Sequence, residues 1–487
     1  MRPCGNAALT RTRLIATLGP ALAPPGQLEA LLDAGVDLCR LNFSHGELEG
    51  HRALLERVRA WAGRHDRPVA VLGDLCGPKI RLNAVRGGTL ELCTGERVGF
   101  VRGGEECEAG RLTTTYAKFV DEVQVGHRIY IDDGLVRLLA TDVGPDAVVA
   151  AVTAGGRIAS RKGVNLPDTR ISAPALTEKD RGDLGWAIEH DLDYVGLSFV
   201  RRPADLLELR DILDGRGSRA GVIVKIEKAE ALEHLDQFVA GADGVMVARG
   251  DLGVEMDVWQ VPLIQKAIVA RCRQAGKPVI VATQMLQSMV SNPTPTRAEV
   301  SDIANAILES VDAVMLSAET ATGQFPLLAV EMMQRVARAA EGYRAQFPAD
   351  QPATSLPTTA RCTSAIASAA VQAARQLDAK LVAVWTATGE TVRLVAQQRL
   401  PMPVVGLTYD ERVWRRLNLL YGVVPIHVPV ITNPLEMMPV LDARVVDQRL
   451  ASPGDLIVVV TSTRPQSPGA TDTVLVRRIG EPGDTPA

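Results

Sequence analysis

Short runs of aliphatic and β-branched residues alternate along most of the chain with longer segments in which apolar residues recur at helical spacing. This alternation is typical of parallel strands joined by helices, because each strand is covered on both faces. We predict strands at Leu14–Thr17, Leu38–Asn42, Val69–Asp74, Tyr194–Leu197, Val222–Lys225, Gly244–Val247, Val279–Ala282 and Ala313–Leu316. Eight strand–helix units within about 300 residues predict a closed (β/α)8 TIM barrel, whose functional residues follow the carboxyl ends of the strands.

The barrel pattern is interrupted between Leu82 and Pro167, where the spacing becomes period-two and rich in turn residues. We predict strands at Arg128–Ile131, Leu135–Ala140 and Ala147–Val152 there, and no helix. The barrel therefore covers residues 10–81 and 168–345, and an all-β domain is inserted at residues 82–167.

A second change of pattern follows the barrel. Residues Pro348–Thr359 are rich in Pro, Thr and Ser, as in a linker. A new α/β alternation then includes apolar runs at Leu381–Trp385, Val404–Leu407 and Leu456–Val460. We predict a third, C-terminal α/β domain over residues 355–482.

Composition and charge exclude several classes of protein. With 46% hydrophobic and 23% charged residues, the 487-residue chain fits an ordinary globular protein. A net charge of −4 argues against nucleic acid or a membrane surface as partner, and no run approaches the roughly 18 apolar residues of a membrane-spanning helix. Gly19 and Pro20 break the apolar run after Arg13, which favours a strand and turn over a signal peptide. Seven cysteines without metal-site or redox-site spacing favour reduced thiols and a cytoplasmic location.

Polar residues follow nearly every predicted barrel strand. A packed scaffold does not require them there, whereas an active site does. They are Arg40, Asn42, Ser44, His45, Asp74, Lys79, Arg81, Ser198, Lys225, Glu227, Arg249, Asp251, Thr283, Ser317 and Glu319.

Two of these residues, Glu227 and Asp251, are carboxylates that follow adjacent strands. Such a pair suits a hard divalent ion that keeps some waters and a substrate oxygen, with Mg²⁺ as the expected metal. Lys225 lies two residues before Glu227 and so points the same way. A lysine beside a metal fits phosphoryl transfer, in which positioning and charge compensation dominate. The alternative is a simple salt bridge at the barrel rim.

Several stretches together resemble the pyruvate kinase family over nearly the whole chain. They are RLNFSHG at residues 40–46, KGVNLP at 162–167, KIE at 225–227, MVARGDLG at 246–253, GKPVIVATQML at 276–286, PTPTRAEVSDIANA at 293–306 and MLSAETA at 315–321. The resemblance implies transfer of phosphate from phosphoenolpyruvate to ADP, which forms ATP and pyruvate in the last step of glycolysis. It also implies that the insert is a lid and that the protein is a homotetramer.

The resemblance assigns catalytic roles by position. Glu227 and Asp251 would hold Mg²⁺, or Mn²⁺ in its place, while Lys225 and Arg40 would neutralise the transferred phosphoryl group. Thr283, with Ser317 beyond it, would position or relay the proton that converts the enolate to pyruvate.

The resemblance also assigns binding roles. Backbone amides at Gly250 and Asp251 would bind the substrate carboxylate, because a helix start offers free N–H donors. The remaining expected contacts are Ser198 and Arg249 for the substrate, and Arg81, Lys162, His45 and Asn42 for the nucleotide.

One position departs from the family pattern. Much of the family requires a monovalent cation, held at positions that match Asn42, Ser44, Asp74 and Leu75, with a glutamate at the position of Lys79. The Lys79 ammonium supplies the single charge that K⁺ would bring. We therefore predict that activity does not require K⁺.

In the third domain, a loop after a strand carries Thr386, Thr388, Gly389 and Thr391, a pattern of hydroxyls and free amides that suits anions. The family binds phosphorylated effectors at this loop, so a sugar phosphate or a nucleoside monophosphate is the expected class of allosteric ligand. Glu390 would repel phosphate, and a plain helix cap is the alternative.

Two other functions remain open from sequence. One is a metal-dependent lyase that forms a pyruvate-like enolate on the same barrel. The other is a catalytically silent paralogue that binds metabolites and regulates. Glu299, in contrast, is assigned a structural role, because with Thr296 it forms a capping box at a helix start.

Overall fold

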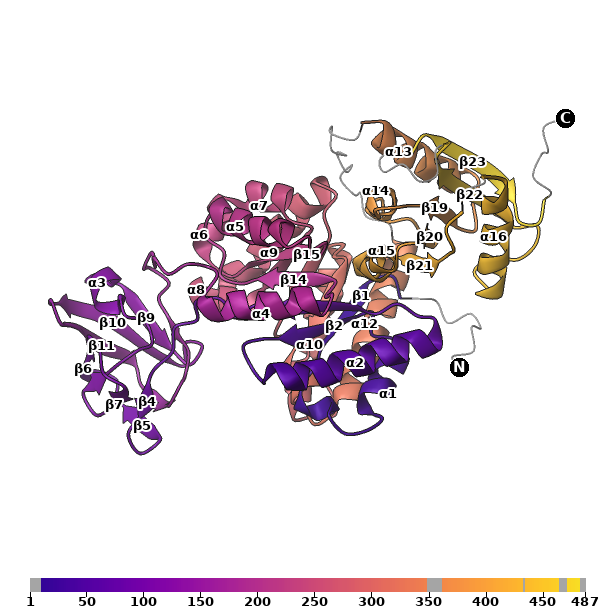
Figure 1. Cartoon of the computed structure of the whole chain (residues 1–487). Coiled ribbons are helices and arrows are strands. Elements are labelled where there is room, and N and C mark those ends of the chain that lie inside the picture. Colours follow the sequence, from indigo (N-terminus) through magenta and orange to yellow (C-terminus); the bar gives the residue numbers. More distant parts are fainter. Residues whose placement is uncertain (1–9, 348–360, 432–433, 464–470, 482–487) are drawn as a thin grey trace.

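The computed structural model of the chain describes residues 10–347, 361–431, 434–463 and 471–481. Eight parallel strands close into a barrel in the order β1-β18-β17-β16-β15-β14-β3-β2 (Figure 1). Their bounds are β1 Arg13–Thr17, β2 Leu38–Asn42, β3 Ala70–Asp74, β14 Tyr194–Leu197, β15 Gly221–Ile226, β16 Gly244–Ala248, β17 Val279–Ala282 and β18 Ala313–Leu316. The predicted (β/α)8 barrel is confirmed, and each predicted strand overlaps an observed one.

Helices surround this barrel and bury the outward-facing side chains of its strands. They are α1 Gln27–Asp33, α2 Leu48–His65, α4 Glu178–Glu189, α5 Pro203–Gly215, α6 Ala229–Glu233, α7 Leu235–Gly241, α8 Arg249–Glu255, α9 Val261–Gln274, α10 Arg297–Leu308, α11 Ala318–Ala321 and α12 Pro326–Gln346, with short 3-10 turns η1 Pro20–Leu22, η2 Val258–Gln260 and η3 Gln287–Val290. Inside the barrel, Ile15, Leu72, Ile223, Met246 and Ile280 belong to a separate apolar cluster. The barrel is therefore a packed core, and only its ends are available for chemistry.

The insert after β3 consists of small antiparallel and mixed sheets. Its strands are β4 Ala84–Val85, β5 Thr89–Leu92, β6 Arg97–Val101, β7 Glu106–Cys107, β8 Arg111–Leu112, β9 Arg128–Ile131, β10 Val136–Val143, β11 Ala147–Ala154, β12 Gly156–Ala159 and β13 Val164–Asn165. Buried and exposed residues alternate along β10, so one face of the main sheet packs inward. The prediction of no helix is wrong in one place, because Phe119–Glu122 forms the short helix α3.

The segments that enter and leave the insert pair with each other. The Leu82 amide donates to the Lys162 carbonyl at 2.8 Å, and the Val164 amide donates to the Ile80 carbonyl at 2.9 Å. We call residues 79–82 and 162–165 the lid neck. Its two segments form one ribbon, so they move together rather than separately.

The C-terminal domain has a five-stranded sheet in the order β21-β20-β19-β22-β23. Its elements are α13 Arg361–Gln376, β19 Val382–Trp385, α14 Glu390–Ala396, β20 Val404–Thr408, α15 Glu411–Arg416, η5 Leu417–Leu419, β21 Val423–His427, α16 Pro434–Asp447, β22 Leu456–Thr461 and β23 Thr473–Arg478. The predicted α/β domain is confirmed. The predicted linker Pro348–Thr359 lies outside the described residues.

The C-terminal domain attaches to the end of the barrel where the strands begin. The Tyr194 hydroxyl at the start of β14 donates to the Arg416 carbonyl at 2.9 Å, and Asn418 bonds the Pro68 carbonyl just before β3. Figure 1 shows the insert and the C-terminal domain on opposite sides of the barrel. Among the residues that the structure describes, no helix is long and apolar enough to cross a membrane.

Candidate active site

A buried ammonium lies at the carboxyl end of β15. Lys225 Nζ donates to Ser198 Oγ at 2.7 Å, and it is 2.9 Å from Glu227 Oε1 and 3.1 Å from Asp74 Oδ1. Three neighbouring strand ends, those of β3, β14 and β15, thus place an oxygen against one lysine. Lys225 is 8% exposed and Glu227 0%, so these charges interact with little screening by water.

Asp74 connects this ammonium to a second cation. Arg40 Nε donates to Asp74 Oδ2 at 2.7 Å, while the other oxygen of Asp74 faces Lys225. The arrangement requires Gly196 on the neighbouring strand, because a Cβ there would lie 2.8 Å from Asp74 Oδ1. Arg40 and Lys225 therefore hold their positive charges at one place, on either side of a shared carboxylate.

The pKa values follow from this geometry. Burial opposes the charge on Lys225, but the carboxylates of Asp74 and Glu227 outweigh burial and raise its pKa. Burial raises the pKa of Glu227 from 4.5 to about 6, against the effect of Lys225, and the charge of Asp251 adds to the rise. The Asp74 pKa is lowered, because Lys225 and Arg40 overcome its burial. The site at neutral pH thus contains two cations and two buried carboxylates.

Glu227 keeps one oxygen available. Its Oε2 accepts the Phe199 amide at 2.7 Å, whereas its buried Oε1 has no hydrogen-bond partner among the described residues beyond its ionic contact with Lys225. Asp251, on the next strand end, has a side chain that is 25% exposed. No group of three or more His, Cys, Asp or Glu side chains is placed to hold a metal in the described ranges. Two carboxylates, one buried and one partly exposed, fit Mg²⁺, which binds through one or two carboxylates plus water and phosphate oxygens.

Thr283 and Gly250 meet beside this pair. The Thr283 hydroxyl donates to the Ala282 carbonyl at 2.6 Å and accepts the Gly250 amide at 2.7 Å. A Cβ at Gly250 would lie 3.2 Å from that hydroxyl, so glycine permits the close approach. The Gly250 amide thus bonds the Thr283 hydroxyl in the structure, and its expected contact with the substrate carboxylate stays a prediction.

Arg249, whose expected contact with the substrate stays a prediction, bonds the loop that follows β17. Its guanidinium donates to the Thr283 carbonyl at 2.9 Å and the Gln284 carbonyl at 3.1 Å, and it is 2.6 Å from Asp302 Oδ2. Thr283 and Gln284 both have positive φ, of 66° and 53°, a strained region for residues with side chains. Arg249 thus braces the Thr283 loop.

Ser317 follows β18 at the same end of the barrel. Its amide donates to Glu319 Oε2 at 2.7 Å, and its buried hydroxyl has no partner among the described residues. The other Glu319 oxygen accepts the Leu286 amide at 3.0 Å. Glu319 thereby ties the loop after β18 to the loop after β17, which carries Thr283.

The expected nucleotide residues lie on the lid neck and the loop after β2. Arg81 bonds the Arg161 carbonyl at 3.1 Å, and Lys162 pairs with Asp132 at 2.9 Å. Partial burial, followed by the charges of Arg81 and Lys79, lowers the pKa of His45. Neighbouring cations that repel a proton from His45 form a positive field, which suits phosphate oxygens.

The residues expected to hold a monovalent cation contact several different partners in the structure. Asn42 Oδ1 accepts the Ser44 amide at 3.1 Å, and the Leu75 carbonyl accepts the Ser198 hydroxyl at 2.6 Å. Lys79 Nζ lies 3.6 Å from Asp251 Oδ1. The Lys79 ammonium therefore faces a carboxylate that is expected to hold the divalent metal.

In the C-terminal domain, the expected effector loop is internally bonded. The Thr386 hydroxyl accepts the Gly389 amide at 2.8 Å, and the Thr391 hydroxyl pairs with that of Thr471 at 2.8 Å. Glu390 forms an ion pair with Arg393. Thr388 and Gly389 line a cavity of about 100 Å³ against the barrel. The N-cap of α14 is Gly389, and no side chain caps this helix, so these bonds order the loop without forming the helix cap that was the alternative to effector binding.

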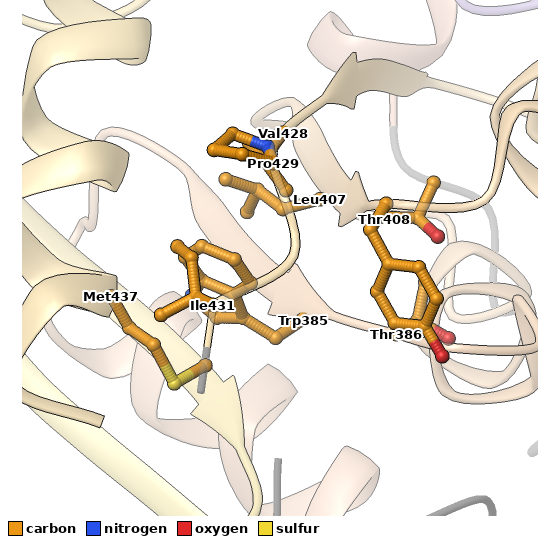
Figure 2. A pocket seen from close by; sticks show the side chains of 9 residues that line it. Trp385, Thr386, Leu407, Thr408, Val428, Pro429, Ile431 and Met437 are labelled. Atoms are coloured by element: carbon orange, nitrogen blue, oxygen red, sulfur yellow. The ribbon is translucent and has the colours of Figure 1, made fainter. Parts of the chain in front are cut away.

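Figure 2 shows a second pocket beside this loop, at the carboxyl ends of β19 and β20. Trp385, Leu407, Ile431 and Met437 gather on one side, and Thr386 and Thr408 lie on the other. Its cavity volume of about 20 Å³ has room for about one water molecule.

Sequence reasoning missed two contributors. The Phe199 amide donates to Glu227. Phe199 has a φ of 53°, a strained conformation that cannot be predicted from the pattern of side chains. Glu255, at the end of α8, bonds both the insert and the residue after Glu227. Its position four residues after Asp251 on a predicted helix was the available signal.

The fold and this geometry define a class of protein: a (β/α)8 enzyme with a lysine and two carboxylates arranged for metal-assisted phosphoryl transfer. Comparison with known proteins agrees. Residues 9–330 match the family model of the pyruvate kinase barrel domain, and residues 364–477 match that of the pyruvate kinase alpha/beta domain.

Individual relatives cover almost the whole chain. It is 41% identical to a pyruvate kinase of Mycobacterium intracellulare, over 97% of this chain and 99% of the relative. It is 42% identical to one of Agrobacterium vitis, over 96% and 97%. A crystal structure of a pyruvate kinase from Cryptosporidium parvum matches with a TM-score of 0.89 and 33% identity, over 96% of both chains. The chain belongs to the pyruvate kinase family and is a phosphotransferase.

Proposed function

We propose that the chain catalyses Mg²⁺-dependent transfer of the phosphoryl group of phosphoenolpyruvate to ADP, and so forms ATP and pyruvate in glycolysis. The observation that carries the proposal is the buried Lys225 ammonium, 2.9 Å from Glu227 Oε1, an oxygen that accepts no other contact among the described residues. A metal-dependent lyase that forms a pyruvate-like enolate on the same fold would need no phosphate-compensating pair such as Lys225 and Arg40.

The residues of the chain act mainly through charge. When bound by Glu227 and Asp251, the divalent ion would supply positive charge to phosphate and enolate oxygens. The bond from phosphorus to the enol oxygen breaks as a terminal oxygen of ADP bonds to phosphorus. Lys225 and Arg40 keep their protons throughout and compensate the negative charge of the group in transit.

The enolate that remains must gain a proton at its methylene carbon. The Thr283 hydroxyl can position that proton, because it lies beside Gly250 on the loop that Arg249 braces. Ser317, with its unpartnered buried hydroxyl on the next loop, would connect Thr283 to solvent. We propose that the substrate carboxylate takes over the Gly250 amide as it binds and releases the Thr283 hydroxyl.

The nucleotide would bind between the barrel mouth and the insert. Arg81 and Lys162 lie on the lid neck. Arg81 bonds a backbone carbonyl and Lys162 forms a partly exposed ion pair, so neither is fixed in a buried ion pair. Closure of the insert would bring both cations onto the ADP phosphates and exclude water from the transfer.

We also propose that Lys79 removes the need for K⁺. Its ammonium stands 3.6 Å from Asp251, where it supplies one fixed positive charge. Activity in tetramethylammonium buffer is then expected to stay within about twofold when KCl is added, since the charge is already present. Large activation by KCl in the wild type would contradict the proposal. The Lys79→Glu variant is expected to require K⁺.

The test of the main proposal couples pyruvate release to an NADH-dependent dehydrogenase while ADP, Mg²⁺ and phosphoenolpyruvate are varied one at a time. Equal amounts of ATP and pyruvate are expected. Pyruvate formation without ATP would mean that the phosphoryl group passes to water instead of ADP, and absence of turnover would indicate a lyase or a regulator. Because its proposed substrates are glycolytic metabolites, we place the enzyme in the cytoplasm, and we propose a homotetramer, which light scattering would test.

A further inference from the structure

One face of α8 contacts both segments of the lid neck. Asp251 and Glu255 are four residues apart on this helix and therefore point to the same side. Asp251 Oδ1 is 3.6 Å from Lys79 Nζ on the incoming segment. Glu255 Oε1 accepts a hydrogen bond of 2.8 Å from Asn165 Nδ2 on the outgoing segment. The helix that bears a proposed metal carboxylate is thus also the base of the insert.

Glu255 has a second partner on the neighbouring strand end. Its Oε2 lies 2.7 Å from Lys228 Nζ, and the two side chains are 2% and 10% exposed. Lys228 directly follows Glu227 in the chain. Removal of one partner of such a buried ion pair strongly destabilises a protein. Glu255 therefore holds Lys228 and Asn165 together in one buried network. Glu255 joins α8, the outgoing neck segment and the segment that carries Glu227.

The two attachments of the neck differ in strength. The Asn165–Glu255 hydrogen bond is buried and short, whereas the Lys79–Asp251 pair is longer, and its side chains are 30% and 25% exposed. Because the two segments are bonded to each other through Leu82 and Val164, the position of one determines that of the other. The outgoing segment is therefore the fixed side of the neck.

We propose that Glu255 is a positioning residue for phosphoryl transfer, which anchors the lid neck through Asn165 so that Arg81 and Lys162 reach the nucleotide. This proposal rests on the proposed function. Arg81 and Lys162 lie within the neck, whereas Lys225, Glu227 and Thr283 lie on the barrel. If the neck loses its anchor, Arg81 and Lys162 are displaced, whereas the three barrel residues stay in place. Loss of the anchor therefore weakens ADP binding selectively.

Three variants test the anchor. Asn165→Ala removes the hydrogen bond and leaves the buried Lys228–Glu255 pair intact, so the protein is expected to fold. Asn165→Asp places two carboxylates against each other. The double variant Asn165→Asp, Glu255→Gln restores a donor and an acceptor in swapped positions, but it moves the negative charge from position 255 to position 165 and so also removes the ion pair with Lys228. The exposed lid variant Arg86→Ala, which breaks the Arg86–Glu106 pair elsewhere in the insert, is the control.

The KM for ADP is expected to rise about fivefold in Asn165→Ala, the equivalent of one hydrogen bond, and further in Asn165→Asp. The KM for phosphoenolpyruvate should change less than about twofold, and the swap should restore much of the loss. Equal changes in both KM values for Asn165→Ala, or no change in either, would overturn the proposal. Exchange of pyruvate methyl protons with D₂O, measured with Mg²⁺ and phosphate, should persist in all variants. If the wild type lacks turnover, the proposed function fails instead.

Discussion

The Lys225 ammonium is the residue on which phosphoryl transfer most directly depends. It contacts Ser198, Asp74 and Glu227 at 2.7 to 3.1 Å. The negative charges of Asp74 and Glu227 raise the pKa of Lys225. A proton held this firmly is not transferred during the reaction. We therefore propose that Lys225 acts as a fixed charge rather than as a general acid.

Replacement of this charge should affect turnover far more than binding. Lys225→Met is expected to lower kcat about 10²- to 10³-fold, the range for loss of one preorganised electrostatic contact. Steady-state assays at saturating substrates measure the loss. Lys266→Met serves as the control and should retain full activity. It removes the ion pair between Lys266 on α9 and Glu309 at the end of α10. Undiminished kcat in Lys225→Met would favour the regulator instead.

Protonation of Glu227 should govern metal binding. Burial sets its pKa at about 6 in the free protein, so the carboxylate is ionised at pH 7 and becomes protonated below pH 6. A proton and a divalent ion compete for the same carboxylate. The apparent Kd for Mn²⁺, measured by electron paramagnetic resonance of the free ion, should rise about tenfold between pH 7 and pH 5, since one proton competes.

This pH dependence has a direct control. Glu227→Gln cannot be protonated in this range, so its weaker residual Mn²⁺ binding should vary little between pH 7 and pH 5. A Kd for the wild type that stays constant over that range would show that Glu227 is not the group that titrates.

The sequence predicted the charged residues of the site better than their partners. Lys225, Glu227 and Asp251 follow strand ends, and barrel topology alone brings such residues together. Gly250 and Arg249 were assigned to the substrate because nothing in a sequence shows which backbone groups are already bonded. Their actual partners, the Thr283 hydroxyl and carbonyl, lie on a loop more than thirty residues away.

Among the elements, α10 depends on a cap that the sequence identified correctly. Thr296 accepts the Glu299 amide, and the Glu299 carboxylate accepts the Thr296 amide in return. The same carboxylate accepts from the Ser288 amide and hydroxyl at 2.7 and 2.6 Å. Burial opposes its charge, but these hydrogen bonds prevail and lower its pKa. Glu299 thus fixes the start of α10 to η3.

Loss of this cap should loosen the helix start and leave catalysis intact. Thr296→Ala is expected to cost about 1 kcal/mol locally. Amide hydrogen exchange in the first turn of α10 should become about fivefold faster, because the opening equilibrium shifts by that amount. Thr322→Ala, which removes a weak 3.4 Å contact of an exposed hydroxyl, is the control. Unchanged exchange in Thr296→Ala would show that Ser288 alone holds Glu299.

The elements that the sequence missed have physical reasons. Strand β21 contains Pro425, which lowers strand propensity, but the strand lies at the edge of its sheet, where the missing N–H is tolerated. Strand β23 is largely exposed and therefore lacks an apolar pattern. Helix α3 is too short for periodicity to reveal it. The buried barrel strands, in contrast, leave the continuous apolar signal from which they were predicted.

At the scale of the whole molecule, the C-terminal domain is joined to the barrel by buried charges. Arg399 donates to both carboxylate oxygens of Asp312 at 2.9 Å, and their side chains are 1% and 0% exposed. Asp312 also accepts the Val279 amide at 3.0 Å and Gln397 at 3.1 Å. Asp312 directly precedes β18, and Val279 is the first residue of β17; these strands end next to Ser317 and Thr283.

This junction predicts strong coupling between the two domains. Asp312→Asn leaves the Arg399 guanidinium buried without its counter-charge, and we expect a loss of about 3–5 kcal/mol in stability. Calorimetry should show a lower melting temperature and a C-terminal domain that melts before the barrel. Arg219→Ala breaks the exposed Arg219–Asp410 pair across the same junction, where the arginine is 57% exposed, so it should cost at most about 1 kcal/mol. Equal losses in the two variants would show that the junction is held by apolar packing, because a buried ion pair and an exposed one cannot otherwise contribute alike.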